Sequence, residues 1–177
     1  MWHMKGVIAI CLGELISEKF SRDKWEEVLE GAGLPRKTFF LATEDVDDAA
    51  TMRVVASVCK VMGMSMTQAA DAFGEYWFNV YAPRIYKVHY AGKKSAKEML
   101  MALNHIHKSV ANHSPNAHPP KFEYDWKDDK TLLMTYQSSR GLIDFFIGIV
   151  KGVGIYYKEK LSITKLPNNK VEIRFQG

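Results

Sequence analysis

Hydrophobic residues in the first two-thirds of the chain recur every three or four positions, which is the spacing of helices with one buried face. A second helix is predicted from about Ser21 to Gly31. A third is predicted to begin after Thr43, because the acidic residues that follow suit the positive end of a helix, and to run to Gly63. The first helix carries its apolar face at Val7, Ile8, Cys11, Leu12, Leu15 and Ile16.

Two capping boxes mark the starts of two more helices. Ser65 with Gln68 opens a helix that is predicted to end at Pro83. Ser95 with Glu98 opens another, which ends in a loop that holds three of the six prolines of the chain.

Alternation of apolar and polar residues takes over after that loop. Strands are predicted over 122–126 and 131–136, and again over 161–166 and 170–175, with a helix over 141–158 between the two pairs. The predicted fold class is therefore α+β, with a helical N-terminal part packed on a C-terminal part that has a small antiparallel sheet and flanking helices.

The length of the chain bounds its organisation. At 177 residues it is long enough for one well-buried core and too short for two ordinary domains. We therefore expect a single domain over 1–177, with a helical subdomain over about 1–65 and a subdomain with the sheet over about 66–177.

Composition removes several classes of function. The sequence has no run of about eighteen apolar residues and no signal-peptide pattern, so we expect a cytoplasmic protein without a membrane segment. The net charge of +4 comes without a basic stripe, which gives nucleic-acid binding little support. Cys11 and Cys59 lie in apolar helical patterns, so we expect buried reduced thiols rather than a disulfide or a metal site.

His107 differs from the other histidines because it shares the inward stripe of its predicted helix. It lies seven residues after Leu100 and four after Leu103, whereas His105 is turned about 200° away. A neutral imidazole on such a face is either a core histidine with a backbone hydrogen bond or a ligand for a metal or a haem iron. The pattern alone leaves both interpretations open.

A zinc cluster is a third interpretation of the histidines. It would combine His105, His107, His113 and His118. The first two point to opposite faces of the helix, and no cysteine or ordered carboxylate accompanies them, so the pattern does not favour zinc.

A second candidate site lies near the end of a predicted strand, in Tyr136-Gln137-Ser138-Ser139-Arg140. Alternation along a strand would place Tyr136, Ser138 and Arg140 on one face, where two hydroxyls and a guanidinium can hold one carboxylate or phosphate. A half-exposed strand face with a surface salt bridge is the plain alternative. A guanidinium just before a hydrophobic helix nevertheless predicts an anionic partner. No glycine-rich phosphate loop accompanies the motif, which lowers the case for a nucleotide.

Taken together, these segments resemble the H-NOX family, the haem nitric oxide/oxygen binding domains of bacteria and of the soluble guanylate cyclase β subunit. The resemblance runs from about Met4 to the end of the chain. It rests on the Tyr-x-Ser-x-Arg motif, His107, the opening Met4-Lys5-Gly6, the segment Phe73-Gly74-Glu75-Tyr76-Trp77, the Pro119-Pro120 pair and a glycine-bearing C-terminal helix.

The resemblance implies one H-NOX domain with a haem between a distal helical part and a proximal part with the sheet. It implies that His107 is the proximal ligand of a ferrous haem b, and that Tyr136, Ser138 and Arg140 grip the haem propionates. It places these residues in the haem pocket: Ile8, Leu12, Trp77, Phe78, Tyr81, Leu103, Pro120, Phe145 and Ile149.

Phe145 indicates which gas the resemblance implies. Family members that hold oxygen stably have a distal tyrosine five residues beyond the motif arginine, and its hydroxyl donates to the bound dioxygen. This chain has Phe145 there. The resemblance therefore implies a sensor of nitric oxide that also binds CO, although Trp77 or Tyr76 is an alternative donor.

The family also implies how the signal leaves the domain. Nitric oxide weakens the iron–histidine bond, the helix that carries the histidine moves, and the haem relaxes from a distorted shape. The signal then passes to a separate protein, either a histidine kinase or a cyclic-dinucleotide enzyme, and we expect no enzymatic activity in this chain.

Two other functions stay open at this point. A module without haem would bind an organic anion or a phosphoester through Tyr136, Ser138 and Arg140. A haem enzyme acting on oxygen or peroxide is disfavoured, because the sequence shows no distal histidine–arginine pair that would assist O–O cleavage.

Overall fold

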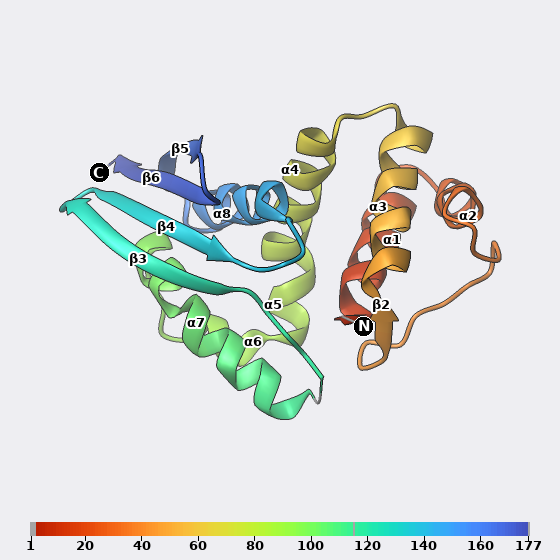
Figure 1. The fold of residues 1–177 in the computed structure, drawn as a ribbon, viewed down its shortest axis with the longest axis horizontal. Coiled ribbons are helices and arrows are strands. Elements are labelled where there is room, and N and C mark those ends of the chain that lie inside the picture. Colours follow the sequence, from red (N-terminus) through yellow and green to blue (C-terminus); the bar gives the residue numbers. More distant parts are fainter. Residues whose placement is uncertain (1–2, 115, 177) are drawn as a thin grey trace. The chain divides into compact units, whose positions relative to one another are not determined.

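The computed structural model describes residues 3–176 except residue 115, and it has the α+β fold class predicted from the sequence (Figure 1). The described residues divide into two units. Unit 1 contains 3–69 and 114–118 without residue 115, and unit 2 contains 70–113 and 119–176. No helix in the described residues is long and apolar enough to span a bilayer.

Unit 1 is mainly helical and carries a sheet of two strands. The strands β1 and β2 pair antiparallel, with Met4 opposite Val46. The helix α4 (Met66–Tyr76) begins in unit 1 and continues into unit 2. The other elements of unit 1 are β1 (His3–Lys5), α1 (Val7–Lys19), α2 (Arg22–Gly31), β2 (Asp45–Asp47) and α3 (Asp48–Met62).

The start of α3 differs from the prediction. Asp47, not Thr43, caps the helix, and its side chain accepts a hydrogen bond from the backbone N–H of Ala50 at 3.3 Å. The residues between Thr43 and the cap include β2, whose pairing with β1 the local sequence does not reveal. Several acidic residues follow Thr43, so more than one start satisfied the same charge rule.

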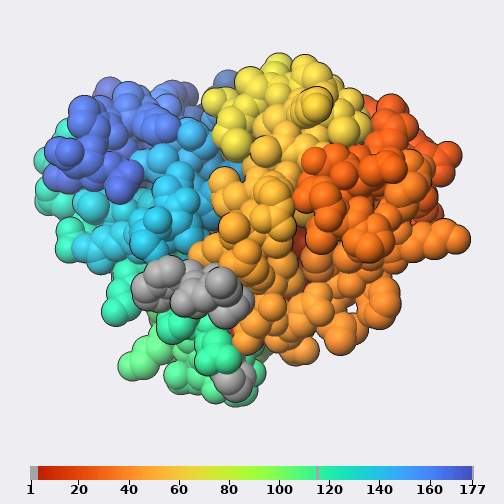
Figure 2. Space-filling view, turned by 45° about the vertical axis from the view of Figure 1, so that its right-hand side comes forward, coloured from red at the N-terminus to blue at the C-terminus, as the bar shows by residue number. Residues whose placement is uncertain are grey.

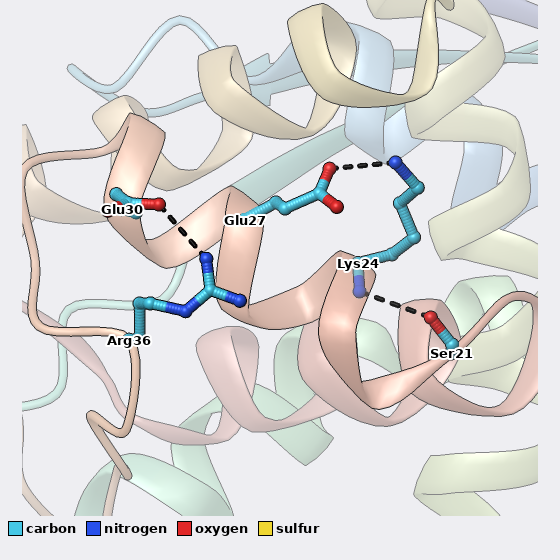
Figure 3. A network of polar contacts seen from close by, with 5 residues as sticks. All are labelled: Ser21, Lys24, Glu27, Glu30 and Arg36. Atoms are coloured by element: carbon cyan, nitrogen blue, oxygen red, sulfur yellow. Dashed lines mark hydrogen bonds and ion pairs between the residues drawn. The ribbon is translucent and has the colours of Figure 1, made fainter.

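A polar network fixes α2 and the segment that follows it (Figure 3). The Ser21 hydroxyl accepts from the backbone N–H of Lys24 at 3.2 Å, and the Lys24 ammonium lies 2.7 Å from Glu27. Arg36 reaches back to Glu30 at 3.0 Å, and its hydrogen bond with this carboxylate raises the pKa of the guanidinium. The network therefore ties the chain after α2 to the helix itself.

The capping boxes form largely as predicted. The hydroxyl of Ser65 accepts from the Gln68 N–H at 3.2 Å, and the Gln68 side chain accepts from the Ser65 N–H at 2.8 Å. Ser95 accepts from the Glu98 N–H at 3.1 Å, but the Glu98 carboxylate takes the N–H of Lys94 in place of that of Ser95. Both boxes therefore mark true helix starts, with one partner shifted by a residue.

The helix that begins near Ser65 does not end at Pro83 as predicted. It passes into a π-helical turn, η1 (Trp77–Tyr81), and then into α5 (Ala82–Ile85), where Pro83 lies in the first turn. Proline is tolerated there because the first N–H groups of a helix have no partner within it.

Unit 2 contains a four-stranded antiparallel sheet in the order β3-β4-β6-β5. The hairpin of β5 and β6 lies at the surface, in dark blue in Figure 2. The elements after α5 are α6 (Lys87–Tyr90), α7 (Ala96–His113), β3 (Lys121–Asp128), β4 (Thr131–Gln137), α8 (Ile143–Tyr157), β5 (Lys160–Leu166) and β6 (Lys170–Gln176).

The core of unit 2 forms where α7 and α8 pack on the sheet. Alternate residues of β4 point into it, as the period of two in a strand requires. Helical side chains spaced three or four apart fill the other side. The buried cluster includes Met99, Leu100 and Leu103 from α7, Phe146, Val150 and Val153 from α8, and Leu132, Met134 and Tyr136 from β4.

Glycines allow α4 and α8 to approach closely. A Cβ atom built on Gly74 would lie 2.0 Å from the carbonyl carbon of Gly148, and one built on Gly148 would lie 2.0 Å from the carbonyl oxygen of Ala70. Backbone atoms cannot yield as a side chain can, so these positions require glycine for packing.

We expect Gly148→Ala to lower the free energy of unfolding by about 1–3 kcal/mol, the usual cost of forcing a methyl group into a packed site. Urea denaturation of the two proteins measures this difference. Ile155→Ala is the control, because Ile155 lies on the same helix and is 52% exposed. Equal losses in both variants would contradict the close approach.

Candidate functional site

His107 is held on α7 by a hydrogen bond to the backbone of a neighbouring segment. Its Nδ1 lies 2.8 Å from the carbonyl oxygen of Pro120. A carbonyl can only accept, so Nδ1 carries the proton of this bond. In the neutral ring, Nε2 then keeps its lone pair, and within the described residues it has no protein partner. One ring nitrogen is thus available to a metal.

The surroundings of His107 favour the neutral ring. Burial lowers the pKa of the imidazole, and the hydrogen bond to Pro120 only partly opposes this effect. The unperturbed pKa of histidine is about 6.5, so a lowered value leaves the ring uncharged at neutral pH. The neutral imidazole is the form that binds metals.

Asn104 joins the same two segments, although no motif in the sequence predicted a role for it. Its side-chain amide donates to the carbonyl of Phe122 at 2.7 Å and accepts from the N–H of Phe122 at 2.9 Å. The only signal in the sequence was its spacing of three residues from His107, which places both side chains on one helical face.

The residues of the Tyr-x-Ser-x-Arg motif meet through a turn rather than through strand alternation. The strand β4 ends at Gln137, so the predicted alternation over Ser138 and Arg140 is wrong. In the turn, the Ser138 hydroxyl accepts from the backbone N–H of Arg140 at 3.3 Å. Burial raises the pKa of Tyr136, while a hydrogen bond with Ser138 and the charge of Arg140 oppose that rise. The three groups therefore act on one another.

Phe122 connects His107 with the motif. Its ring centroid lies 5.7 Å from that of His107, 6.0 Å from that of Tyr136 and 4.6 Å from that of Phe146. Tyr136 also stacks on Phe146 at 5.8 Å. The candidate ligand and the first residue of the motif thus touch the same aromatic cluster.

A second aromatic group includes Phe145. Trp77 stacks between Phe73 and Tyr81, with centroid distances of 5.6 and 5.4 Å, and Phe73 lies 5.1 Å from Phe145. Trp77 and Tyr81 begin and end the π-helical turn η1, a departure from α-helix that often marks functional sites. No pattern in the sequence predicted this turn.

The other predicted pocket residues occupy several places. Phe78 is 4% exposed and packs against Tyr90 and Tyr156, apart from the ring contacts of Phe145. Leu103 and Phe78 belong to the core cluster of unit 2, and the half-buried Ile149 packs against it. Ile8 and Leu12 lie on α1 in unit 1.

The structure does not support a zinc cluster. Among residues 3–114 and 116–176, no three His, Cys, Asp or Glu side chains gather as a metal site. His107 therefore offers a single nitrogen, which suits a metal whose other ligands come from a cofactor.

Comparison with known sequences identifies relatives over nearly the whole chain. Residues 5–165 match the profile of a family described as Haem-NO-binding. The chain is 23% identical over 173 residues to the soluble guanylate cyclase gcy-35 of Caenorhabditis elegans. That match covers 96% of this chain and 25% of the relative, so the chain spans about a quarter of the relative's length.

Solved structures share the fold at low sequence identity. An H-NOX protein from S. oneidensis in the Fe(II)NO ligation state has a TM-score of 0.87 at 19% identity, over 98% of this chain and 100% of that one. An oxygen-binding H-NOX domain related to soluble guanylate cyclases has a TM-score of 0.81 at 22% identity, over 98% and 96%. One of them holds NO and the other oxygen, so the shared fold does not decide between the gases.

The lowered pKa of His107 predicts a pH dependence of stability in the ligand-free protein. Below about pH 6.5 the unfolded chain binds the proton more readily than the folded chain, so stability should fall as the pH falls. We expect the urea midpoint to drop between about pH 7.5 and about pH 5.5, and to drop less in His107→Gln.

His89→Gln serves as a comparison, because burial also lowers the pKa of His89. His89 is less buried than His107. We therefore expect the His107 variant to lose a larger part of the pH dependence of stability than the His89 variant. A His107→Gln protein with the full dependence of the parent would contradict the assignment.

Proposed function

This chain belongs to the haem-NO-binding family, and on that premise we propose that it is a sensor of nitric oxide in which His107 is the proximal ligand of a ferrous haem b. The observation that carries the proposal is the hydrogen bond from His107 to the Pro120 carbonyl. It leaves Nε2 as the one ring nitrogen able to bind iron, in the arrangement that metal-binding histidines usually have.

The residues of unit 2 fit a haem. The histidine is neutral and half-buried, and it adjoins an aromatic cluster that can pack against a flat apolar ring. When bound, a ferrous haem supplies an iron with an open position for a diatomic gas. The protein would then need to provide only one nitrogen ligand, which agrees with the single imidazole of this site.

Tyr136, Ser138 and Arg140 are proposed to bind the propionates. The guanidinium can fork onto one carboxylate, and the hydroxyls can add further donors. The hydrogen bond between Ser138 and the backbone N–H of Arg140, and the effect of Ser138 and of the Arg140 charge on the pKa of Tyr136, support this role. Within unit 2, the residues proposed to contact the apolar faces of the haem are Trp77, Phe78, Tyr81, Leu103, Pro120, Phe145 and Ile149.

His107 is also proposed to be the switch. While Nε2 holds the iron, the position of α7 is tied to that of the cofactor. If the imidazole were released from the iron, α7 would be held only by its protein contacts, and a two-state element of this kind is what signalling requires. The partner is proposed to be a separate cytoplasmic histidine kinase or cyclic-dinucleotide enzyme, with this chain as a sensor and not an enzyme.

Binding of an organic anion without haem is the second candidate, because Tyr136, Ser138 and Arg140 would suit a free carboxylate or phosphoester equally well. An absorption spectrum of the purified protein separates the two. A strong Soret band supports the haem proposal, and a colourless protein that cannot be reconstituted with haem rejects it.

We expect His107→Gly to bind haem poorly, and free imidazole to restore binding because it can occupy the space of the lost ring. The ratio of haem absorbance to protein absorbance measures this. His105→Gly is the matched control, since His105 is exposed on the opposite face of the same helix. Loss of haem in the His105 variant, with normal loading in His107→Gly, would sink the assignment.

We expect the ferrous protein to form no stable complex with oxygen in air and to bind NO with loss of the histidine ligand. Bound dioxygen carries negative charge, and a hydrogen bond to such an acceptor is worth about 1.5–3 kcal/mol, or roughly ten- to a hundredfold in affinity. The Phe145 ring cannot donate one. Absorption spectra under air and under NO test both expectations.

Phe145→Tyr should raise oxygen affinity within that range if its hydroxyl reaches the ligand. Phe73→Tyr is the control, because Phe73 is buried in the same ring group but lies off the motif position. A stable oxygen complex in the unmodified protein would instead identify another donor, such as Trp77 or Tyr76, and overturn the NO-selective proposal.

A further inference from the structure

Asn104 and His107 bind the same short stretch of chain. They lie three residues apart on α7 and so share a face of the helix. Asn104 holds both backbone groups of Phe122, at 2.7 and 2.9 Å, while His107 holds the carbonyl of Pro120 at 2.8 Å. Only Lys121 separates the two residues that are bound.

Phe122 needs a partner of this kind because β3 is an edge strand. In the described sheet, the order β3-β4-β6-β5 places no strand beyond β3. The primary amide of Asn104 offers one donor and one acceptor side by side, as a neighbouring strand would. The orientation of the amide is fixed, because a backbone N–H can only donate and a carbonyl can only accept.

The link from Phe122 back to Pro120 is stiff. The Pro120 carbonyl lies in the planar peptide that joins it to Lys121, and the backbone of Lys121 has the extended conformation of β3. By fixing the position of Phe122, Asn104 therefore also fixes the position of the Pro120 carbonyl relative to the imidazole.

We propose that Asn104 is a positioning residue for His107. By holding Phe122, it sets the Pro120 carbonyl to accept from Nδ1, and so fixes the tautomer and the orientation of the imidazole. The consequence for iron rests on the proposed function, since a hydrogen-bonded Nδ1 makes Nε2 a better ligand. The consequence for the tautomer does not depend on the proposed function.

The test on the protein alone is nitrogen NMR of the haem-free chain labelled at histidine. We expect the parent to show His107 with the proton on Nδ1. In Asn104→Leu and in Asn104→Ser, the ratio of the Nδ1–H to the Nε2–H form should fall roughly five-fold, the factor for one typical hydrogen bond. Asn112→Leu, an exposed site on the same helix, should leave the ratio unchanged.

A merely structural role would lower stability in both Asn104 variants without moving the tautomer ratio, and that result overturns the proposal. Should the larger leucine prevent folding, the smaller serine still decides the question.

The test on the loaded protein is the iron–histidine stretching band in resonance Raman spectra. The band should move to lower frequency in the Asn104 variants and stay in place in Asn112→Leu, because a weaker Nδ1 hydrogen bond lowers the basicity of Nε2. An unmoved band alongside a changed tautomer ratio overturns the part that concerns iron. Failure of the parent chain to bind haem counts against the proposed function, and the tautomer measurement remains valid.

Discussion

The contact of the Phe122 ring with its neighbours is the constraint on which the candidate site depends. This one residue touches His107 from α7, Tyr136 from β4 and Phe146 from α8, at centroid distances of 5.7, 6.0 and 4.6 Å. Its backbone is meanwhile held by Asn104. Because Phe122 is both a core side chain and an edge-strand residue, the packing of the core and the position of the candidate ligand are parts of the same arrangement.

Helices and strands with local signals could be predicted from the sequence. The capping boxes at Ser65 and Ser95 act over three residues, and the alternation in β4 reflects only the pleat of a strand. The pairing of β1 with β2 could not be predicted, because it joins residues far apart in the chain. The turn η1 could not be predicted either. Residue propensities separate helix from other structure, but they do not separate π-helical from α-helical hydrogen bonding.

The candidate site shows the same division. The helical stripe singled out His107, because the period of the helix places it beside Leu103. The hydrogen bond to Pro120, by contrast, depends on where the chain returns after the loop, and no local pattern encodes that. In the Tyr-x-Ser-x-Arg motif, strand alternation was the wrong reason to expect that the three residues lie near one another. A turn after Gln137 brings Ser138 and Arg140 together instead.

The choice of a carbonyl as the partner of His107 bears on the proposed switch. Burial lowers the pKa of His107, and the hydrogen bond to the Pro120 carbonyl, a neutral acceptor, only partly opposes this effect. A carboxylate in that place would give the imidazole more negative character and a stronger bond to iron. A sensor whose histidine must leave the iron needs two states that are close in free energy. An iron–histidine bond that is too strong would hold the protein in one of these states. A neutral partner orients the ring and fixes the tautomer while leaving that bond breakable, which is the balance that the proposed function requires.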